Sequence, residues 1–461
     1  MNCSKTSNND NFAENQYNKM VNTPVSKLIT SLAIPTVISM LVTSIYNMAD
    51  TFFVSQISTQ ASAAVGVVFP IMSIIQAFGF TLGMGSGSLI SIRLGQKRNE
   101  EANVIVSTAF FTALGIGFLI TILGIIFSTQ FLSLVGASDS VLPFAKAYAK
   151  YIFFGAPIMT ASFVLNNVLR SEGKAFFSMI GLTTGGILNI ILDPIFIYAL
   201  DLGISGAAIA TLCSQSISFL ILLTCFLKHK TVCHINIKLY SLKKEVLPKI
   251  VTTGFPSLSR QGLSSISSIL LNTAAGAYGD AAIAGMTITT KIVMFIASIM
   301  IGVGQGFSPV SGYNFGAKRY DRVKQAYKFT LTAGFILMGS LATIIFIFAN
   351  QIMNAFINDI NVVKIGVAAL RWQVAFLPFH SLIIGTNMLM QSTRHIKSAT
   401  YLSMNRNGIY FIPAILILPR IIGLQGVEMA QFVADVLSAI TAVPFAIYFF
   451  KKMSNYNSEQ N

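Results

Sequence analysis

The fold of this protein is decided first by the stretch from Leu28 to Val54, which reads LITSLAIPTVISMLVTSIYNMADTFFV. It is long enough for a membrane-spanning helix, which needs about 20 mainly apolar residues. Near its end lies the segment YNMAD, residues 46–50. An aspartate inside such a helix costs about 2.5–3.5 kcal/mol on insertion scales. We therefore expect Asp50 to be paired, to face water or to serve the function of the protein.

The composition of the whole chain indicates a membrane protein. Of its 461 residues, 54% are hydrophobic and 10% are charged, whereas soluble domains carry about 25% charged residues. Long apolar runs recur from one end of the chain to the other, as in proteins that cross the membrane many times. The four cysteines have neither the spacing of metal ligands nor that of a disulfide framework.

These runs predict an all-α membrane protein with twelve transmembrane helices. The predicted spans are residues 28–54, 62–90, 103–127, 142–169, 175–199, 204–227, 248–274, 281–311, 325–349, 365–391, 398–420 and 425–450. Residues 1–24 are polar and predict a disordered tail, and residues 451–461 a second tail. Residues 228–247 mix lysine with isoleucine and leucine, and predict a cytoplasmic linker with a helix on the inner membrane surface.

The loops between the predicted spans alternate in charge. One set is rich in basic residues such as Lys97, Arg98 and Lys318, and the other set is nearly free of them. By the positive-inside rule, the basic loops and both termini lie in the cytoplasm. Topology thus accounts for the net charge of +15, and we do not expect nucleic acid as a partner.

The sequence also repeats itself. Pro35 and Pro256 are 221 positions apart, and Gly95 and Gly316 have the same offset. Such an offset over a long stretch indicates two homologous halves. Six spans return the chain to the side on which it began, so the halves are parallel repeats, as in many transporters. We predict two pseudo-symmetric six-helix bundles, residues 25–227 and 248–450.

Of the acidic residues within predicted spans, Asp50, Asp193 and Asp435 are the candidates for a functional site. Tyr46 and Asn189 each precede an aspartate by four residues, which places the two side chains of each pair on one helix face. Tyrosine and asparagine can donate hydrogen bonds to a carboxylate, and apolar surroundings favour its neutral form. The two pairs therefore predict a site that binds and releases protons. The alternative is that each aspartate ends its helix among the lipid headgroups.

Comparison of the two halves shows that Asp50 and Asp193 have no acidic counterparts. Asp50 corresponds to Leu271, and Asp193 corresponds to Pro413 or Ala414. The C-terminal half thus lacks both acids, which a purely structural role would not obviously require.

Four further residues within spans are secondary candidates. Pro35 lies in the span of Asp50, and because proline kinks helices it predicts a bending point. Asp435 is expected either to make a polar packing contact with a basic residue or to form a second ion site. Arg260 is expected to pair with Asp435, to reach the membrane interface or to line a cavity for an anion. Gln305 lies in the glycine-rich stretch 302–306, which favours close helix packing over phosphate binding.

Five stretches carry a more specific signal. They are IYNMADTFFV at 45–54, NNVLRSEG at 166–173, NIILDP at 189–194, GQGFSP at 304–309 and YNFGAK at 313–318. Together they resemble the multidrug and toxic compound extrusion (MATE) family, and most closely its MepA-like bacterial branch. The resemblance covers about residues 25–450.

The resemblance implies a V of two six-helix bundles around a large cavity. It also implies outward export of cationic, aromatic compounds in exchange for protons or sodium ions, with no other cofactor. The implied cation-coupling site consists of Tyr46, Asp50, Asn166, Asn189, Asp193 and Thr211. A further acidic site of some relatives, in the C-terminal half, has no clear match in this sequence. We expect a monomer in the bacterial plasma membrane, embedded in lipid.

The sequence therefore predicts a cation-coupled multidrug efflux antiporter. It is not expected to be an enzyme, because it contains no nucleophile paired with a base and no ATP-binding motif. The closest competing hypothesis is a flippase for lipids or lipid-linked oligosaccharides of the same superfamily. Basic residues within or beside C-terminal spans favour it, and the acids of the N-terminal half disfavour it. These basic residues are Arg260, Lys291, Arg371 and Arg406. A passive channel without ion coupling and a membrane scaffold are two further hypotheses.

Overall fold

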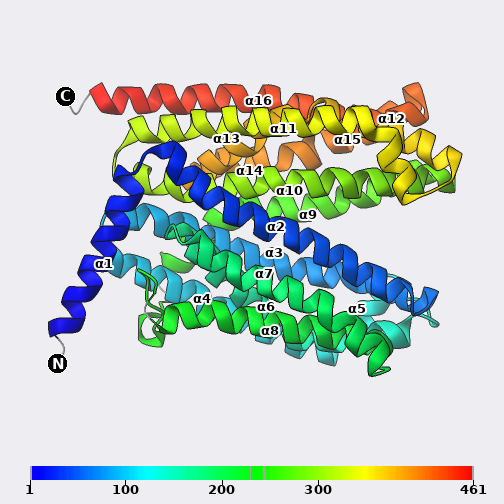
Figure 1. Cartoon of the computed structure of the whole chain (residues 1–461), viewed down its shortest axis with the longest axis horizontal. Coiled ribbons are helices and arrows are strands. Elements are labelled where there is room, and N and C mark those ends of the chain that lie inside the picture. The colour runs from blue at the N-terminus through cyan, green and yellow to red at the C-terminus, as the bar shows by residue number, and fades with distance from the viewer. Residues whose placement is uncertain (1–2, 229, 242–244, 459–461) are drawn as a thin grey trace.

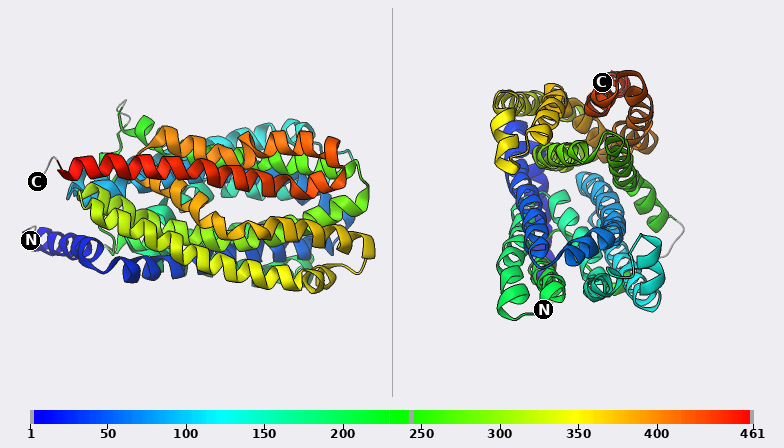
Figure 2. Two further views of the ribbon diagram at one scale, coloured as in Figure 1. Left: turned by 90° about the horizontal axis from the view of Figure 1, so that it is seen from above. Right: turned by 90° about the vertical axis from the view of Figure 1, so that its right-hand side faces the viewer.

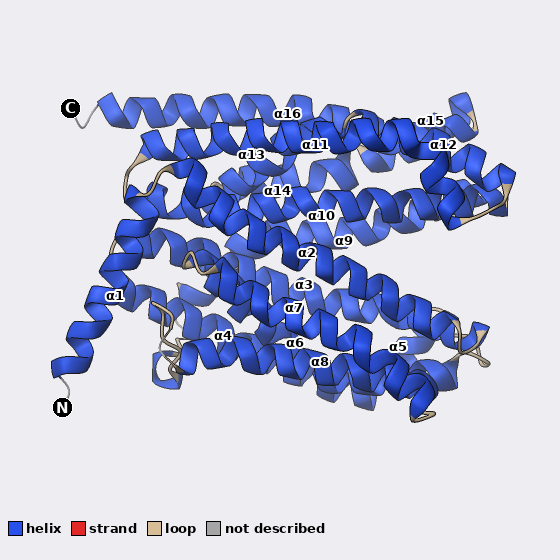
Figure 3. Ribbon diagram, viewed as in Figure 1, coloured by secondary structure: helices blue, strands red, loops and turns tan. Residues whose placement is uncertain are grey.

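The computed structural model describes the chain apart from residues 1–2, 229, 242–244 and 459–461, and apart from the side chains of 3–10 and 454–458. The described chain is helical, with short loops and no strand (Figures 1 and 3). The N-terminal half contains α1 (Cys3–Asn22), α2 (Val25–Ser55), α3 (Thr59–Gly95), α4 (Asn99–Ile126), α5 (Ser128–Leu134), α6 (Leu142–Ser171), α7 (Ala175–Pro194), η1 (Ile195–Ala199) and α8 (Gly203–Leu227). After η2 (Ile237–Leu239) follow α9 (Val246–Gly276), α10 (Asp280–Gly316), α11 (Tyr320–Phe356), α12 (Ile360–Ala375), η3 (Leu377–Phe379), α13 (His380–Ser392), α14 (Ile396–Met404), η4 (Asn405–Ile409), α15 (Phe411–Ile422) and α16 (Leu424–Ser458).

The helices form two bundles that lie side by side, one from each half of the sequence (Figures 1 and 2). Packing between the bundles follows the repeat, since α2 packs along α10 and the corresponding helix α9 packs along α3. The backbone repeats as well, because Lys97 (φ 57°) and Lys318 (φ 58°) adopt the same left-handed conformation at corresponding turns. The predicted fold class is confirmed. We propose residues 25–227 and 248–450 as the extents of the two bundles.

Nine helices of the described chain are long and apolar enough to cross a membrane. The pair Ile360–Ala375 and Leu377–Ser392, bent by 42°, passes the same test only when both helices are taken together, which brings the number to at most ten in the described chain. Two predicted spans are not apolar and continuous enough to qualify. Residues 248–274 form α9, which is rich in serine and holds Arg260. Residues 398–420 form α14 and α15, which the π-helical turn η4 separates.

The N-terminal tail differs from its prediction. Instead of being disordered, residues 3–22 form α1, and Met20 near its end is completely buried. The second predicted tail continues α16 as far as Ser458. Composition favoured disorder because α1 is polar, but a polar helix can be held by docking on a folded body. Both described ends of the chain lie at the same end of the molecule (Figure 1).

The linker between the bundles is bound to the N-terminal bundle. Between α8 and α9, the described residues contain only the short 3₁₀ turn η2, so the predicted surface helix is wrong there. The backbone amides of Val232 and Cys233 donate hydrogen bonds of 2.8 and 2.9 Å to the buried Glu172 carboxylate. The amide of His234 donates to Asn103 Oδ1 at 2.8 Å.

The bundles approach closely at the end that carries the basic loops. Gly95 of α3 and Gly316 of α10 are corresponding positions that leave no room for a side chain. A Cβ on Gly95 would lie 2.2 Å from the Tyr313 carbonyl oxygen, and one on Gly316 would lie 2.2 Å from that of Ile92. Only glycine lets backbones come this near. We call this contact, formed by residues 92–95 and 313–316, the interbundle seam.

Candidate functional site

Helices α2, α7 and α8 bring the predicted polar residues of the N-terminal bundle together. α7 packs on both α2 and α8, which places Asn189 and Asp193 near the other two helices. The Asn189 amide nitrogen donates to Asp193 Oδ1 at 3.2 Å and to Thr211 Oγ1 at 3.3 Å. All three side chains belong to residues that are at most 5% exposed. The predicted Asn189/Asp193 pair is therefore formed, and Thr211 joins it from α8.

Asp50 belongs to the same cluster, although it comes from a distant part of the sequence. Asp50 and Asp193 lie close enough for their charges to interact. Tyr46, one turn before Asp50 on α2, is also within range of the Asp50 carboxylate. The two aspartates of separate spans thus lie in one lobe, on helices that pack against each other.

Three oxygen atoms of this cluster are buried without a hydrogen-bond partner: Asp50 Oδ1, Asn189 Oδ1 and Asp193 Oδ2. Among the described residues, no lysine, arginine or histidine forms an ion pair with either aspartate. A buried carboxylate without a partner is strongly disfavoured, and two neighbouring carboxylates do not easily stay ionised together. The arrangement therefore suits the uptake of a proton or of a small cation that prefers oxygen ligands.

Tyr148 of α6 is a member of the cluster that the sequence analysis missed. It is fully buried, and it lies within interaction range of Asp50, Asp193 and Thr211. Its hydroxyl group lies beside Asp50 and Thr211, close enough to exchange a hydrogen bond with either after a small movement. One signal could have found it, because Tyr148 corresponds to Ala369 in the repeat and so shows the same asymmetry as the acids.

Asn166 does not join the cluster. Its amide nitrogen donates to Ser178 Oγ at 2.7 Å. It follows Tyr148 by 18 positions on α6, which is about 27 Å along a helix. Its counterpart Asn387 makes the same kind of contact, donating to Ser403 Oγ at 2.8 Å. Both bundles thus use this asparagine to join neighbouring helices.

Asp435 lies in a network of a different kind in the C-terminal bundle. Arg406 Nε donates to Asp435 Oδ1 at 2.7 Å, and Gln431 Nε2 donates to the same atom at 2.9 Å. His380 Nε2 lies 2.9 Å from Asp435 Oδ2. The carboxylate charge is therefore compensated by an arginine inside the bundle. This geometry matches the expected polar contact with a basic residue, and it pairs Asp435 with Arg406 instead of Arg260.

Gln305 and Arg260 have different surroundings. Gln305 Oε1 accepts a hydrogen bond from Arg170 Nη1, which connects α10 to α6 across the two bundles. Arg170 also donates to Asn167 Oδ1 at 3.0 Å. Among the described residues, Arg260 takes part in none of the hydrogen bonds or ion pairs, although it lies in the middle of α9.

Pro35 lies inside α2, which runs from Val25 to Ser55 without interruption. Ser39 Oγ donates to the Pro35 carbonyl oxygen at 2.8 Å. Such side-chain bonds to the preceding turn often accompany helix bends. The helix is unbroken at this position, and the bending point remains a prediction.

Comparison with known families returns one family model, MatE. It matches twice, over residues 35–195 and over residues 256–416. The two matched segments are the two halves of the repeat, and together they cover more than half of the chain.

The chain is also similar to characterised transporters. It is 28% identical to the multidrug export protein MepA of Staphylococcus aureus (strain NCTC 8325 / PS 47) over 421 residues, which cover 91% of this chain and 93% of that protein. It is 27% identical to MepA of Staphylococcus saprophyticus over 420 residues, with the same coverage. A solved outward-facing structure of a multidrug resistance MATE family transporter of the MOP superfamily superposes with a TM-score of 0.91 at 28% identity, covering 95% of this chain and 98% of that one. A MOP superfamily transporter from Pyrococcus furiosus, for which a reversed polarity of the binding pocket suggests a different function, gives a TM-score of 0.89 at 28% identity and the same coverage.

Proposed function

Because the chain belongs to the MatE family, we propose that it is a multidrug efflux antiporter that exports cationic, amphipathic organic compounds in exchange for protons or sodium ions. Members of this family are transporters and not enzymes, so the protein is a membrane transporter. The similarity to the MepA proteins supports multidrug export. The exported compounds and the coupling ion are parts of the proposal.

One observation carries the coupling mechanism. Asp50 and Asp193 lie together in the N-terminal bundle with unpartnered oxygen atoms and no basic neighbour in ion-pair range among the described residues. The C-terminal bundle neutralises its own buried aspartate with Arg406. The N-terminal cluster, unlike Asp435, therefore lacks a compensating charge from the described part of the protein, which is the property a coupling site requires.

In the proposed transport cycle, protons supply the charge that compensates Asp50 and Asp193. When the cluster faces the cell exterior, protons neutralise Asp50 and Asp193 and remove the repulsion between them. The hydrogen bonds from Asn189 and the neighbouring hydroxyl groups then change, which shifts α2 and releases the drug outward. In the inward-facing state the aspartates lose their protons to the cytoplasm and take part in binding the next cationic compound. Coupling requires only that the ion and the drug bind preferentially to different states of the transporter, one facing outward and the other facing inward.

Mutation of Asp50 tests this proposal. We expect Asp50→Asn to abolish proton-driven accumulation of a fluorescent cationic dye in everted vesicles, because an amide cannot exchange a proton. The matched control is Asp139→Asn, which makes the same change at an exposed carboxylate outside the cluster. Unchanged accumulation with Asp50→Asn, at equal protein in the membrane, would contradict the proposal. Replacing the proton gradient with a sodium gradient in the same vesicles identifies the coupling ion.

A lipid or oligosaccharide flippase is the second candidate, and Arg260 favours it. A cation without an ionic partner inside a membrane helix suits an anionic group such as a lipid phosphate. A flippase predicts that Arg260→Gln abolishes transport of a fluorescent phospholipid in reconstituted vesicles and leaves cationic dyes unaffected. The acids of the N-terminal bundle support the antiporter instead.

We also propose that the protein is a monomer in the bacterial plasma membrane with both termini in the cytoplasm. The basic loops support this orientation, because positively charged loops stay on the inner side. The interbundle seam then closes the cytoplasmic end. This placement agrees with the similarity to the outward-facing structure.

A further inference from the structure

Helix α1 lies at the end of the molecule that carries the basic loops, outside the two bundles (Figures 1 and 2). From residue 11 onward, its partly or fully buried side chains follow the spacing i, i+3, i+4, i+7 and i+8, and they are Ala13, Gln16, Tyr17, Met20 and Val21. Side chains such as Asn15 on the other face are exposed. This spacing describes one stripe of a helix that faces the protein. The polar outer face and the narrow buried stripe indicate a helix that docks on the bundles instead of entering the membrane.

The first set of α1 contacts is made to the N-terminal bundle. Gln16 Nε2 donates to the Glu172 carbonyl oxygen at 2.7 Å, in the turn between α6 and α7. Gly173 in the same turn has φ +81°, and a Cβ there would lie 2.6 Å from the Met20 sulfur. Glycine thus gives both the left-handed turn and the space for Met20.

The second set is made to the C-terminal bundle. Asn314 Nδ2 of α10 donates to the Met20 carbonyl oxygen at 3.3 Å. Arg322 Nη2 of α11 donates to the Thr23 carbonyl oxygen at 2.5 Å, and Arg322 Nε donates to Asn314 Oδ1 at 2.9 Å. Two side chains of the C-terminal bundle therefore bind the chain at the end of α1, while Gln16 and Met20 contact the N-terminal bundle.

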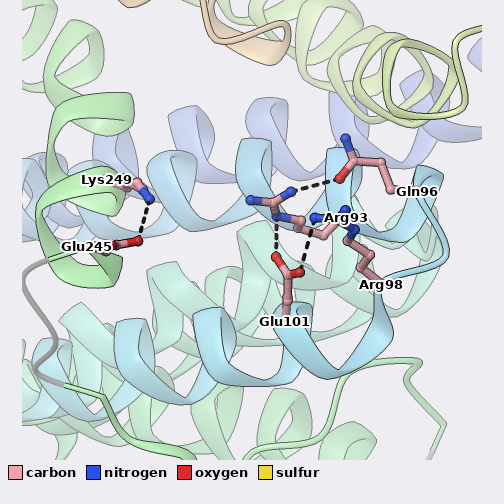
Figure 4. A network of polar contacts seen from close by, with 6 residues as sticks. All are labelled: Arg93, Gln96, Arg98, Glu101, Glu245 and Lys249. Carbon is pink, nitrogen blue, oxygen red and sulfur yellow. Dashed lines mark hydrogen bonds and ion pairs between the residues drawn. The ribbon is translucent and has the colours of Figure 1, made fainter.

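The repeat shows that this contact is particular to the C-terminal bundle. Asn314 and Arg322 correspond to Arg93 and Glu101, which form an ion pair of 2.9 Å inside the N-terminal bundle (Figure 4). In the C-terminal bundle the arginine stands in place of the acid and asparagine in place of the arginine. This exchange leaves the guanidinium free to bind the carbonyl oxygen of Thr23.

Beneath α1 lies the interbundle seam. Tyr313, whose carbonyl oxygen meets Gly95, also lines a cavity of about 170 Å³ together with Ala13 and Tyr17 of α1. Leu94 and Lys97, at the end of α3, line the same cavity. α1 therefore covers the line along which the bundles would separate.

We propose that α1 is a latch that stabilises the state in which the cytoplasmic end is closed. The proposal rests on the alternating access assumed under the proposed function. When the bundles separate at the seam, α1 cannot keep both the Glu172–Gly173 turn and the Asn314–Arg322 pair. One set of contacts must break, so α1 binding favours the closed state. The surface ion pair of Glu14 with Lys97, at 3.3 Å, contributes little because both side chains are exposed.

A distance measurement tests the latch without reference to transport. Spin labels are placed at Glu100 of α4 and Gln325 of α11, which are exposed positions near the seam end in the two bundles. The docking-face variant replaces Gln16, Tyr17 and Met20 by alanine. We expect its ratio of long to short label distances, measured by pulsed electron spin resonance, to rise about tenfold over the unaltered chain.

The matched control replaces three exposed residues of the same helix, Asn11, Asn15 and Asn18, by alanine. It changes as many side chains as the docking-face variant, neither variant alters the net charge, and we expect unchanged distances for the control. Equal distance distributions for the docking-face variant and the control would overturn the latch. The labels report the opening of the seam even in a protein that exports no drug, so this result and a failure of the proposed function are distinguishable.

A second measurement applies if the docking-face variant is poorly folded. The chain lacking residues 2–22 is combined with a synthetic peptide of residues 3–22. We expect the peptide to restore the short distances, and a peptide with Tyr17 and Met20 replaced by alanine to leave them long. If neither peptide changes the distances of a truncated protein that has opened, or if truncation opens nothing, the proposal is wrong.

Discussion

Asp50 and Asp435 are both aspartates in membrane-spanning helices, yet their surroundings give them opposite properties. Asp435 has Arg406 at 2.7 Å, so its charge is compensated within the protein. Asp50 has an unpartnered oxygen atom and lies near a second aspartate, Asp193. A compensated carboxylate stabilises one structure, whereas an uncompensated one responds to the ions around it. The difference lies in the neighbours of each residue and not in the residue type.

Tyr148 provides a prediction at the same scale. We expect Tyr148→Phe to shift the pH dependence of dye export while leaving the protein folded, because it removes a hydroxyl group near both acids and keeps the ring that fills the core. Tyr148→Ala should in addition lower the melting temperature, since deletion of a buried aromatic ring costs about 3–5 kcal/mol. Export rates across a pH series and melting curves in detergent measure the two effects. An identical pH profile for Tyr148→Phe would exclude the hydroxyl group from the coupling site.

Individual helices show where local patterns and tertiary contacts disagree. α1 is polar enough to predict disorder, but its stripe of Ala13, Tyr17 and Met20 docks on both bundles. The span containing α14 and α15 is interrupted by the π-helical turn η4. Arg406 of that turn binds Asp435 of α16, so a side-chain network supports the interruption. Wider turns of this kind often occur at functional or strained sites.

The network at η4 makes a prediction about stability. We expect Asp435→Asn to destabilise the protein by about 3–5 kcal/mol, because it leaves the Arg406 guanidinium without a compensating charge in the bundle. The change should appear as a lower melting temperature of the purified protein in detergent. The double substitution Asp435→Asn with Arg406→Met should recover part of the loss. A melting temperature that stays the same for the single substitution would show that the ion pair contributes nothing.

The molecule as a whole is two similar bundles that meet at a seam without side-chain space. Gly95 and Gly316 place each backbone directly against the other bundle. Any side chain at Gly95 or Gly316 would weaken this seam, and few polar contacts must break when the bundles separate there. It suits two rigid bodies that separate and rejoin, while Arg170–Gln305 and α1 add specific contacts that hold it closed.

The seam gives a prediction at this scale. We expect Gly95→Ala to favour the state that is open at the cytoplasmic end, because the new methyl group would lie 2.2 Å from the Tyr313 carbonyl oxygen. Alkylation of a single cysteine introduced in the seam should become several-fold faster. Gly115→Ala is the matched control, since a Cβ there meets no atom within 4 Å. Equal alkylation rates in both variants would show that the seam tolerates the added atom.

By itself the sequence determined the membrane class, the all-helical fold, the repeat and the position of Asp50 and Asp193 in one half. Hydropathy, the charge of the loops and the constant repeat offset do not depend on contacts between distant residues. They can therefore be read from the sequence without a structure. The Asn189/Asp193 pair was also predictable, because residues four positions apart share a helix face.

Only the tertiary structure decided which of these residues meet. Tyr148 lies beside Asp50 and Asp193. Asn166 lies about 27 Å from Tyr148 along α6 and binds Ser178. Asp435 forms an ion pair with Arg406. The docking of α1 across both bundles was equally invisible in a polar sequence. The physical reason is common to all four cases. Contact between helices depends on their rotation and depth in the packed bundle, and many distant residues set these together.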